Sequence, residues 1–220
     1  MKARFGGLSF NNEMDHESEI KIDLGNELNY RRLIDFCATA GQTIKQDNYF
    51  FDTDDRALLN CHWAVRVRIE ADTASLTLKG PKEKSPAGLA MRPELIAEIS
   101  VAKAQSLLAD GIAVAELPEK FQPFLSSEIA GKTLRSNISF VNYRITSPWT
   151  VNNLNLTLEI DRTVFSDGAI DYELEIELPE ARLFQIVVEA LPSFLSRLGI
   201  PLVFQPESKL ARALKRNEAG

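Results

Sequence analysis

The stretch Glu17-Ser-Glu-Ile-Lys-Ile-Asp-Leu24 alternates strictly between polar or charged and apolar residues. Side chains of a β-strand point alternately to its two faces, so this pattern predicts a strand with one charged and one apolar face. The charged face carries Glu17, Glu19, Lys21 and Asp23. Because like charges two residues apart on a strand lie only about 7 Å from each other, the two glutamates repel unless a counter-charge faces them.

Similar alternation recurs along the chain, and several polar faces carry a single sign of charge. These faces hold Arg66 with Arg68, Glu94 with Glu98, and Glu173 with Glu175 and Glu177. Strands are predicted for residues 17–24, 46–53, 64–70, 75–79, 92–99, 134–145, 155–161 and 172–178. Helices are predicted for residues 26–40, with Asn26 as the cap, for 101–109, for 180–198, with an interruption at Pro192, and for 207–216, with a proline-broken helical segment over 116–127. A polar turn is predicted between the strands over 46–53 and 64–70.

The ordinary interpretation of one such strand is a half-buried strand whose polar face meets water. Solvent faces usually mix Thr, Ser, Lys and Gln, however, whereas these faces are nearly pure in sign. If the charged faces converge on one cavity, a divalent cation there can neutralise the carboxylates and phosphates can neutralise the basic groups. We therefore predict an α+β, mainly β fold, a closed antiparallel β-barrel with a charged lumen, covered on its apolar outside by α-helices.

Composition narrows the functional classes. The length of 220 residues favours one large domain. The net charge of −6 argues against a nucleic-acid partner. Its two cysteines, Cys37 and Cys61, have neither disulfide-framework nor zinc spacing. Because no signal peptide and no apolar run of 18 residues occur, we expect a cytoplasmic protein with no membrane partner.

Taken in order, the charged segments resemble those of the CYTH proteins, also called triphosphate tunnel metalloenzymes. The resemblance rests on Glu17-x-Glu19-x-Lys21, Tyr49-Phe-Phe-Asp-Thr53, Val65-Arg-Val-Arg68, Leu76-Thr-Leu-Lys-Gly80, Arg92-Pro-Glu94, Arg135, Asp161, Glu175-x-Glu177 and Ser208-Lys209. It spans about Glu17 to Arg212, and it implies one tunnel domain over residues 17–216 behind an extension over residues 1–16. It also implies an eight-stranded tunnel that processes triphosphates with Mg²⁺ or Mn²⁺.

The resemblance assigns roles to individual positions. The implied metal ligands are Glu17, Glu19, Asp161, Glu175 and Glu177, with Glu94, Glu98 and Glu173 as further candidates. The implied triphosphate-binding residues are Lys21, Arg66, Arg68, Lys79, Arg92, Arg135 and Lys209. Arg144 competes with Arg135 for the late basic position, and register with the following aromatic strand favours Arg135.

Catalysis is assigned to Glu175, Glu177 and Lys21, with one metal ion bridging the phosphates and a second orienting the attacking water. Replacing Glu175 or Glu177 with Gln is then expected to abolish metal-dependent turnover and leave the fold intact.

The leading functional hypothesis is hydrolysis of inorganic triphosphate to pyrophosphate and phosphate, which the Arg92-Pro-Glu94 similarity to inorganic triphosphatases favours. Thiamine triphosphate hydrolysis and class IV adenylate cyclase chemistry are alternatives on the same scaffold, because fold alone does not separate them. A module that binds polyphosphate or a nucleotide without turnover is an alternative of another class. The expected partner is a small anionic triphosphate, and the chain is expected to be a monomer or a homodimer.

Overall fold

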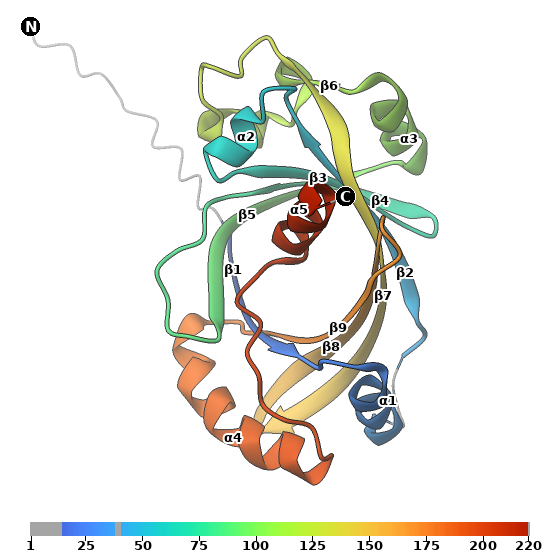
Figure 1. Cartoon of the computed structure of the whole chain (residues 1–220). Coiled ribbons are helices and arrows are strands. Elements are labelled where there is room, and N and C mark those ends of the chain that lie inside the picture. Colours follow the sequence, from blue (N-terminus) through green and yellow to red (C-terminus); the bar gives the residue numbers. More distant parts are fainter. Residues whose placement is uncertain (1–14, 38–40, 220) are drawn as a thin grey trace, which may run out of the picture.

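Eight strands close into an antiparallel barrel in the computed structural model, which describes residues 15–37 and 41–219 (Figure 1). The order around the barrel is β2-β3-β4-β5-β1-β9-β8-β7, and pairing of β2 with β7 closes it. The strands are β1 (Asp15–Asp23), β2 (Ile44–Asp52), β3 (Ala64–Glu70), β4 (Thr73–Lys79), β5 (Leu89–Ile99), β6 (Ile112–Ala113), β7 (Thr133–Val151), β8 (Leu154–Phe165) and β9 (Ile170–Glu177). The short β6 pairs with the end of β7, outside the closed ring. The predicted closed, mainly β barrel is confirmed.

Helices cover the outside of this barrel. They are α1 (Glu27–Phe36), α2 (Ala57–Asn60), α3 (Val101–Asp110), α4 (Phe184–Arg197) and α5 (Lys209–Ala219), with 3₁₀ turns at Val114–Glu116, Glu119–Phe124 and Ala181–Leu183. Figure 1 shows α1 and α4 against the β8–β9 side and α2 and α3 at the opposite side. No helix among the described residues is long and apolar enough to cross a membrane.

The apolar core lies between the barrel and its helices, not within the lumen. Outward-facing Ile22 and Leu174 are fully buried against Leu33 of α1 and Leu195 of α4. A second cluster packs the outer faces of β3 and β4 against α3 and the segment around Phe121. Burial of these apolar faces provides the main driving force for folding, and it leaves the charged faces to line the interior, as predicted.

Helix α5 lies across one end of the barrel, and Figure 1 shows it within the outline of the ring of strands. Leu210 and Leu214 pack on a small cluster that includes Phe50 and Phe140. On the same helix, Arg212 forms ion pairs with Asp171 and Glu173 at 2.8 and 2.5 Å. Apolar packing and ion pairs together hold the C-terminal helix against the lumen.

Several predicted elements differ from the observed ones. The helix predicted over 26–40 is capped by Asn26 as expected and ends at Phe36, while residues 38–40 lie outside the described residues. Pro192 lies inside a continuous α4, although an interruption was predicted there. Most of the predicted extension over residues 1–16 also lies outside the described residues, and β1 begins at Asp15.

The connection between β2 and β3 is a short helix, although the sequence predicted only a polar turn. The Asp52 carboxylate accepts hydrogen bonds from the backbone N–H groups of Leu58 and Leu59 at 2.9 and 3.0 Å. A carboxylate at a helix N-terminus satisfies amides that lack a partner within the helix. Asp52 therefore fixes the position of α2.

Candidate active site

A cavity of about 150 Å³ lies inside the barrel and receives side chains from all eight closing strands and from α5. Its charged lining consists of Glu17, Glu19, Lys21, Arg66, Arg68, Lys79, Arg92, Glu94, Arg144, Glu159, Glu175, Glu177 and Lys209. Phe50, Ile96, Phe140 and Leu210 are among the few large apolar residues at its surface. The cavity is therefore suited to a small, highly charged ligand.

The charges divide the lumen into two walls. The acidic wall is formed by the neighbouring strands β1, β9 and β8, where Glu19 lies opposite Glu177, and Glu159 lies opposite Glu175. The basic wall is formed by β3, β4 and β5, which carry Arg66, Arg68, Lys79 and Arg92. Because strand pairing fixes which residues are adjacent, the division follows directly from the topology.

Glu175 is the centre of a buried charge cluster in the acidic wall. Its carboxylate lies 2.7 Å from Lys21 Nζ, 2.8 Å from Lys209 Nζ and 2.5 Å from Arg144 Nη2. Burial alone raises the pKa of Glu175, but the charges of Lys209, Lys21 and Arg144 outweigh it and hold the pKa well below its usual range. Glu175 is thus ionised and shared among three cations.

Arg144 is anchored by the same wall. Its guanidinium contacts both oxygens of Asp161, at 2.8 and 2.6 Å, and also pairs with Glu159. Asp161 is fully buried and accepts a further contact from Lys209 at 2.9 Å. These bidentate, charge-assisted contacts are among the strongest in proteins, so Arg144 has a close counter-charge of its own.

Arg66 and Arg68 of the basic wall have more distant carboxylate partners than Lys21, Lys79, Lys209 and Arg144 have. Among the described residues, Arg66 has a carboxylate oxygen within 4 Å only at Glu94, and Arg68 only at Glu70, both at 3.7 Å. The buried Nε of Arg66 makes no hydrogen bond to any described residue. Burial lowers the pKa of Arg66, and burial together with repulsion from Arg66 and Arg144 lowers the pKa of Arg68 to about 9. Together with Arg92, whose one carboxylate contact, to Glu17, is also 3.7 Å, these guanidiniums are the cations of the lumen that the described residues neutralise least.

Three carboxylates of the acidic wall, Glu19, Glu159 and Glu177, have raised pKa values. Burial, opposed in part by Lys21, raises the pKa of Glu19 to about 7, and burial also raises the pKa of Glu159 to about 7. Partial burial and the charge of Glu17 raise the pKa of Glu177. Burial disfavours the ionised form of these carboxylates in spite of the cations near them, and carboxylate oxygens are the donors that Mg²⁺ and Mn²⁺ prefer.

The donor set therefore fits a divalent cation chemically, although it is not arranged as a finished metal site. Among the described residues, no three acidic, His or Cys side chains form a metal-binding group. Lys21 lies between Glu19 and Glu175, at 2.8 and 2.7 Å. Binding of a cation here requires the Lys21 ammonium to move away from one of these carboxylates.

Replacing Glu159 with Gln is expected to stabilise the protein above neutral pH. A carboxyl whose pKa is raised on folding favours the fold while it is protonated, so this contribution is lost as the pH rises from about 4.5 through about 7. Relative to the native protein, Glu159→Gln should unfold with a free energy about 1–3 kcal/mol higher at pH 8 and nearly unchanged at pH 4.5.

Urea denaturation at both pH values measures this difference, with the exposed Glu128→Gln as the matched control. A Glu159→Gln variant that is less stable than the native protein at pH 8 contradicts the raised pKa described for Glu159.

Most of the site residues predicted from the sequence line the lumen cavity. Glu98 and Arg135 lie away from it, and Asp161 and Glu173 lie behind it. Glu98 is exposed near the end of β5 and does not line the cavity. Asp161 and Glu173 are buried behind the cavity, where they contact Lys209. The preference for Arg135 over Arg144 is wrong in its placement, because Arg144 enters the lumen whereas Arg135 is exposed beyond it.

Sequence reasoning missed Glu159, Asn142 and Arg212. The signal for Glu159 was present, since Thr157, Glu159 and Asp161 alternate with apolar residues in the predicted strand 155–161. Asn142 shares the lumen face of β7 with Arg144. Arg212 had no comparable signal, because its role depends on how α5 lies across the barrel.

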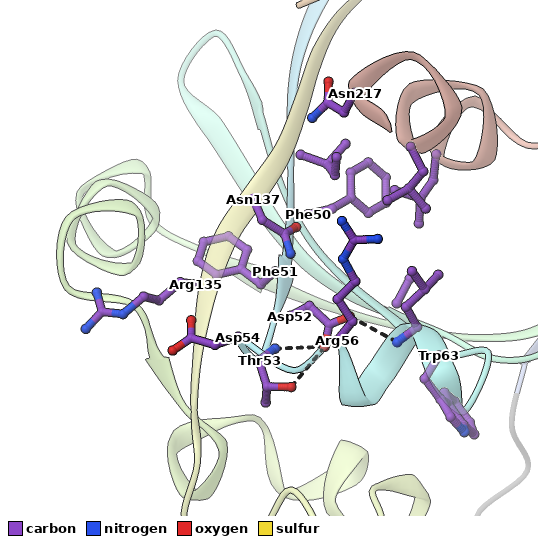
Figure 2. Close-up of a pocket in the computed structure, with 15 residues that line it drawn as sticks. Phe50, Phe51, Asp52, Thr53, Asp54, Arg56, Trp63, Arg135, Asn137 and Asn217 are labelled. Atoms are coloured by element: carbon purple, nitrogen blue, oxygen red, sulfur yellow. Dashed lines mark hydrogen bonds between the residues drawn. The ribbon is translucent and has the colours of Figure 1, made fainter. Parts of the chain in front are cut away.

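A second cavity, of about 310 Å³, adjoins the lumen near α5 (Figure 2). Phe50, Ala64 and Leu210 line both cavities, so the two are neighbours. Figure 2 shows Arg135 at the edge of this outer pocket, with its guanidinium directed away from the other labelled side chains. Trp63 also lines the pocket and packs against Phe124 with ring centroids 6.0 Å apart.

The chain is similar to known proteins both in sequence and in structure. The sequence matches the family described as "CYTH domain" over residues 15–213, and no curated protein matches it. A similar solved structure is HpAC1 from Hippeastrum, a candidate adenylyl cyclase described as having a dominant triphosphatase activity. It is 26% identical, with 90% of this chain and 95% of that chain covered and a TM-score of 0.79.

Two further solved structures share the fold. A candidate adenylate cyclase from Bacillus halodurans is 25% identical, with 88% of this chain and 95% of that chain covered and a TM-score of 0.64. The PH1819 protein from Pyrococcus horikoshii is 21% identical, with coverages of 91% and 99% and a TM-score of 0.60.

Proposed function

The chain belongs to the CYTH domain family, and from that premise we propose that it hydrolyses inorganic triphosphate to pyrophosphate and phosphate within the barrel, with Mg²⁺ or Mn²⁺ as cofactor. The observation that carries this proposal is the pair of under-neutralised guanidiniums, Arg66 and Arg68, in a cavity that also holds an acidic wall. Guanidinium groups bind phosphate oxygens through two parallel hydrogen bonds. A polyanion between the two walls supplies the counter-charge that Arg66 and Arg68 lack.

The remaining lumen residues have two roles in this proposal: some extend the positive charge, and others position the cations. Lys79 lies 2.8 Å from Glu17 and neutralises that carboxylate, and Arg92, 3.7 Å from Glu17, extends the positive wall to β5. Glu175 holds Lys21, Lys209 and Arg144, which makes it a positioning residue for three cations and not a freely available metal ligand. This assignment replaces the direct metal role expected for Glu175 from the sequence.

The carboxylates that would hold a divalent cation are Glu19 and Glu177, cross-strand neighbours on β1 and β9, with Glu17 and Glu159 beside them in the same wall. Such an ion, when bound, neutralises phosphate charge and lowers the pKa of a bound water. The protein's own contribution is to hold the phosphates in line and to surround the leaving pyrophosphate with Arg66, Arg68 and Lys21, whose fixed charges stabilise the charge that develops there.

A second candidate function is hydrolysis of an organic triphosphate ester. The outer pocket favours it, because this space adjoins the lumen and is lined by Phe50, Phe51 and Trp63, which are suited to contact a ring. Thiamine triphosphate and ATP are the substrates to compare, and ATP also reports cyclase activity through formation of the cyclic nucleotide.

A substrate panel tests the proposal directly. Phosphate release should be fastest with tripolyphosphate in the presence of Mg²⁺ or Mn²⁺, and chelation with EDTA should abolish it. Faster turnover of thiamine triphosphate or ATP favours the second candidate. Tight tripolyphosphate binding with no release from any substrate identifies a binding module instead.

Replacing Glu177 with Gln is expected to lower metal-dependent turnover at least about tenfold and to raise the metal concentration required for half-maximal activity. Glu177 is exposed at the rim of the cavity, and its neighbour Glu17 disfavours its ionisation, so the fold should be unaffected. Metal titrations of phosphate release measure the effect, and Glu180→Gln, three residues further along the chain, is the matched control. Equal metal dependence of both variants removes Glu177 from the metal-binding set.

A further inference from the structure

A chain of hydrogen-bonded polar side chains lies beside the lumen cavity, and one of its members, Asn142, also lines that cavity. Thr163 Oγ1 donates to Asn142 Oδ1 at 2.9 Å, Asn142 Nδ2 donates to Gln46 Oε1 at 2.9 Å, and Gln46 Nε2 donates to Glu70 Oε1 at 2.7 Å. Thr163, Asn142 and Gln46 are at most 3% exposed. Buried polar networks whose members are all paired are rigid and hold their neighbours in one orientation, so this chain ties β8, β7, β2 and β3 together.

Asn48 connects this network to the basic wall. It is 1% exposed, its Nδ2 donates to the backbone oxygen of Gln46 at 2.9 Å, and its Oδ1 accepts from Arg68 Nε at 2.9 Å. The amide nitrogen of Asn only donates and the amide oxygen only accepts. The backbone oxygen of Gln46 therefore fixes the direction of the amide, and the Asn48 oxygen must face Arg68.

Arg68 needs such an anchor because its charged neighbours push it away. Arg66 and Arg144 lie close enough to repel its guanidinium, and its carboxylate neighbour Glu70 is 3.7 Å away. With Nε bound to Asn48, the terminal nitrogens are left to face the cavity that Arg68 lines.

The Asn48 anchor is electrically neutral, in contrast to the carboxylate that holds Arg144. Asp161 orients Arg144 through two contacts and cancels its charge at the same time. The amide oxygen of Asn48 orients Arg68 and leaves the positive charge available to an anion.

We propose that Asn48 is a positioning residue that aims the Arg68 guanidinium at a substrate phosphate while leaving its charge free. The inference rests on the proposed triphosphate function for the identity of the anion. Asn48 does not line the lumen cavity, so its effect on binding must pass through Arg68.

A double-mutant cycle on tripolyphosphate binding tests this proposal, with affinities measured by titration calorimetry in EDTA so that no turnover is required. Asn48→Leu removes the hydrogen bond that holds the Arg68 guanidinium in place, so it should weaken binding about tenfold or more. In an Arg68→Met background the same substitution should have no further effect. The exposed Asn60→Leu is the matched control and should bind as the native protein does.

Asn48→Asp, which has the same shape, separates orientation from charge. It keeps an acceptor for Arg68 Nε but neutralises the guanidinium, so it should also weaken binding, and it remains informative if Asn48→Leu does not fold. Native affinity in either folded variant overturns the proposal, as does a loss in Asn48→Leu that is undiminished in the Arg68→Met background. A native protein that binds tripolyphosphate without hydrolysing it contradicts the proposed function while the cycle still decides the role of Asn48.

Discussion

Replacing Arg66 with Met is expected to reduce the kcat/KM for tripolyphosphate at least about 100-fold while leaving the protein as stable as the native form or more so. The guanidinium is buried, its nearest carboxylate oxygen is 3.7 Å away, and its Nε makes no hydrogen bond to the described residues. In the native fold this charge is therefore poorly compensated. Replacing a poorly paired buried ion with an apolar side chain of similar length is neutral or stabilising in many proteins.

The loss of activity has a separate physical origin. Two charge-assisted hydrogen bonds to a phosphate contribute about 1.5–3 kcal/mol each, and together they account for a factor of about 100 or more. Phosphate-release kinetics and urea denaturation of the same preparation measure both effects. Arg182→Met removes the same charge from an exposed site and is the control. If Arg66→Met is strongly destabilised or keeps its kcat/KM, the phosphate-binding role of the basic wall is wrong.

Replacing Glu175 with Gln is expected to lower the free energy of unfolding by about 3 kcal/mol at pH 7. The variant leaves Lys21, Lys209 and Arg144 without the carboxylate that they share. Because the pKa of Glu175 is lowered on folding, its stabilising contribution is present above about pH 4.5 and is lost as the pH falls further. The difference between variant and native protein should therefore shrink in acid.

Glu177 provides the matched comparison, because it lies two residues further along the same face of β9 but is exposed. Glu177→Gln should change the free energy of unfolding by no more than about 0.5 kcal/mol. Urea denaturation of both variants at pH 7 and pH 4 gives the answer. Equal stability of Glu175→Gln and Glu177→Gln removes Glu175 from the centre of the charge cluster and restores the sequence-based expectation that both substitutions leave the fold intact.

The barrel itself could be predicted because period-two alternation reports directly on strand faces. In β1 and β9 every alternate residue is charged, so the two faces could be separated without knowing the neighbours of each strand. The outward position of the apolar faces followed from the single-sign charges opposite them, and the clusters under α1, α3 and α4 confirm it.

The choice between Arg135 and Arg144 could not be made from alternation alone. The predicted strand covered 12 residues, whereas β7 extends over 19, from Thr133 to Val151. At about 3.3 Å per residue, the two arginines are roughly 30 Å apart along this strand. Pairing of β2 with β7 also shifts register between Phe50 and Phe51, and no local pattern reveals where such an irregularity lies.

The ion pairs of the lumen could not be predicted from the sequence either, because they depend on the register between strands that are far apart in the sequence. Lys21 and Glu175 are cross-strand neighbours of β1 and β9, and Glu175 is also the neighbour of Glu159 on β8. The sequence indicated which residues carry charge but not that one carboxylate serves three cations. The prediction that Glu175 is a metal ligand was made without knowledge of these three contacts.

The origin of the two walls along the chain has a consequence for biosynthesis. The basic wall comes from β3, β4 and β5, which are consecutive in sequence, whereas the acidic wall joins β1 to β8 and β9. Ribosomes add about 5–20 residues per second, so Arg66, Arg68, Lys79 and Arg92 are made seconds before Glu159 and Glu175. A nascent chain therefore carries its arginines without the β8 and β9 part of their opposing wall until translation has passed residue 177.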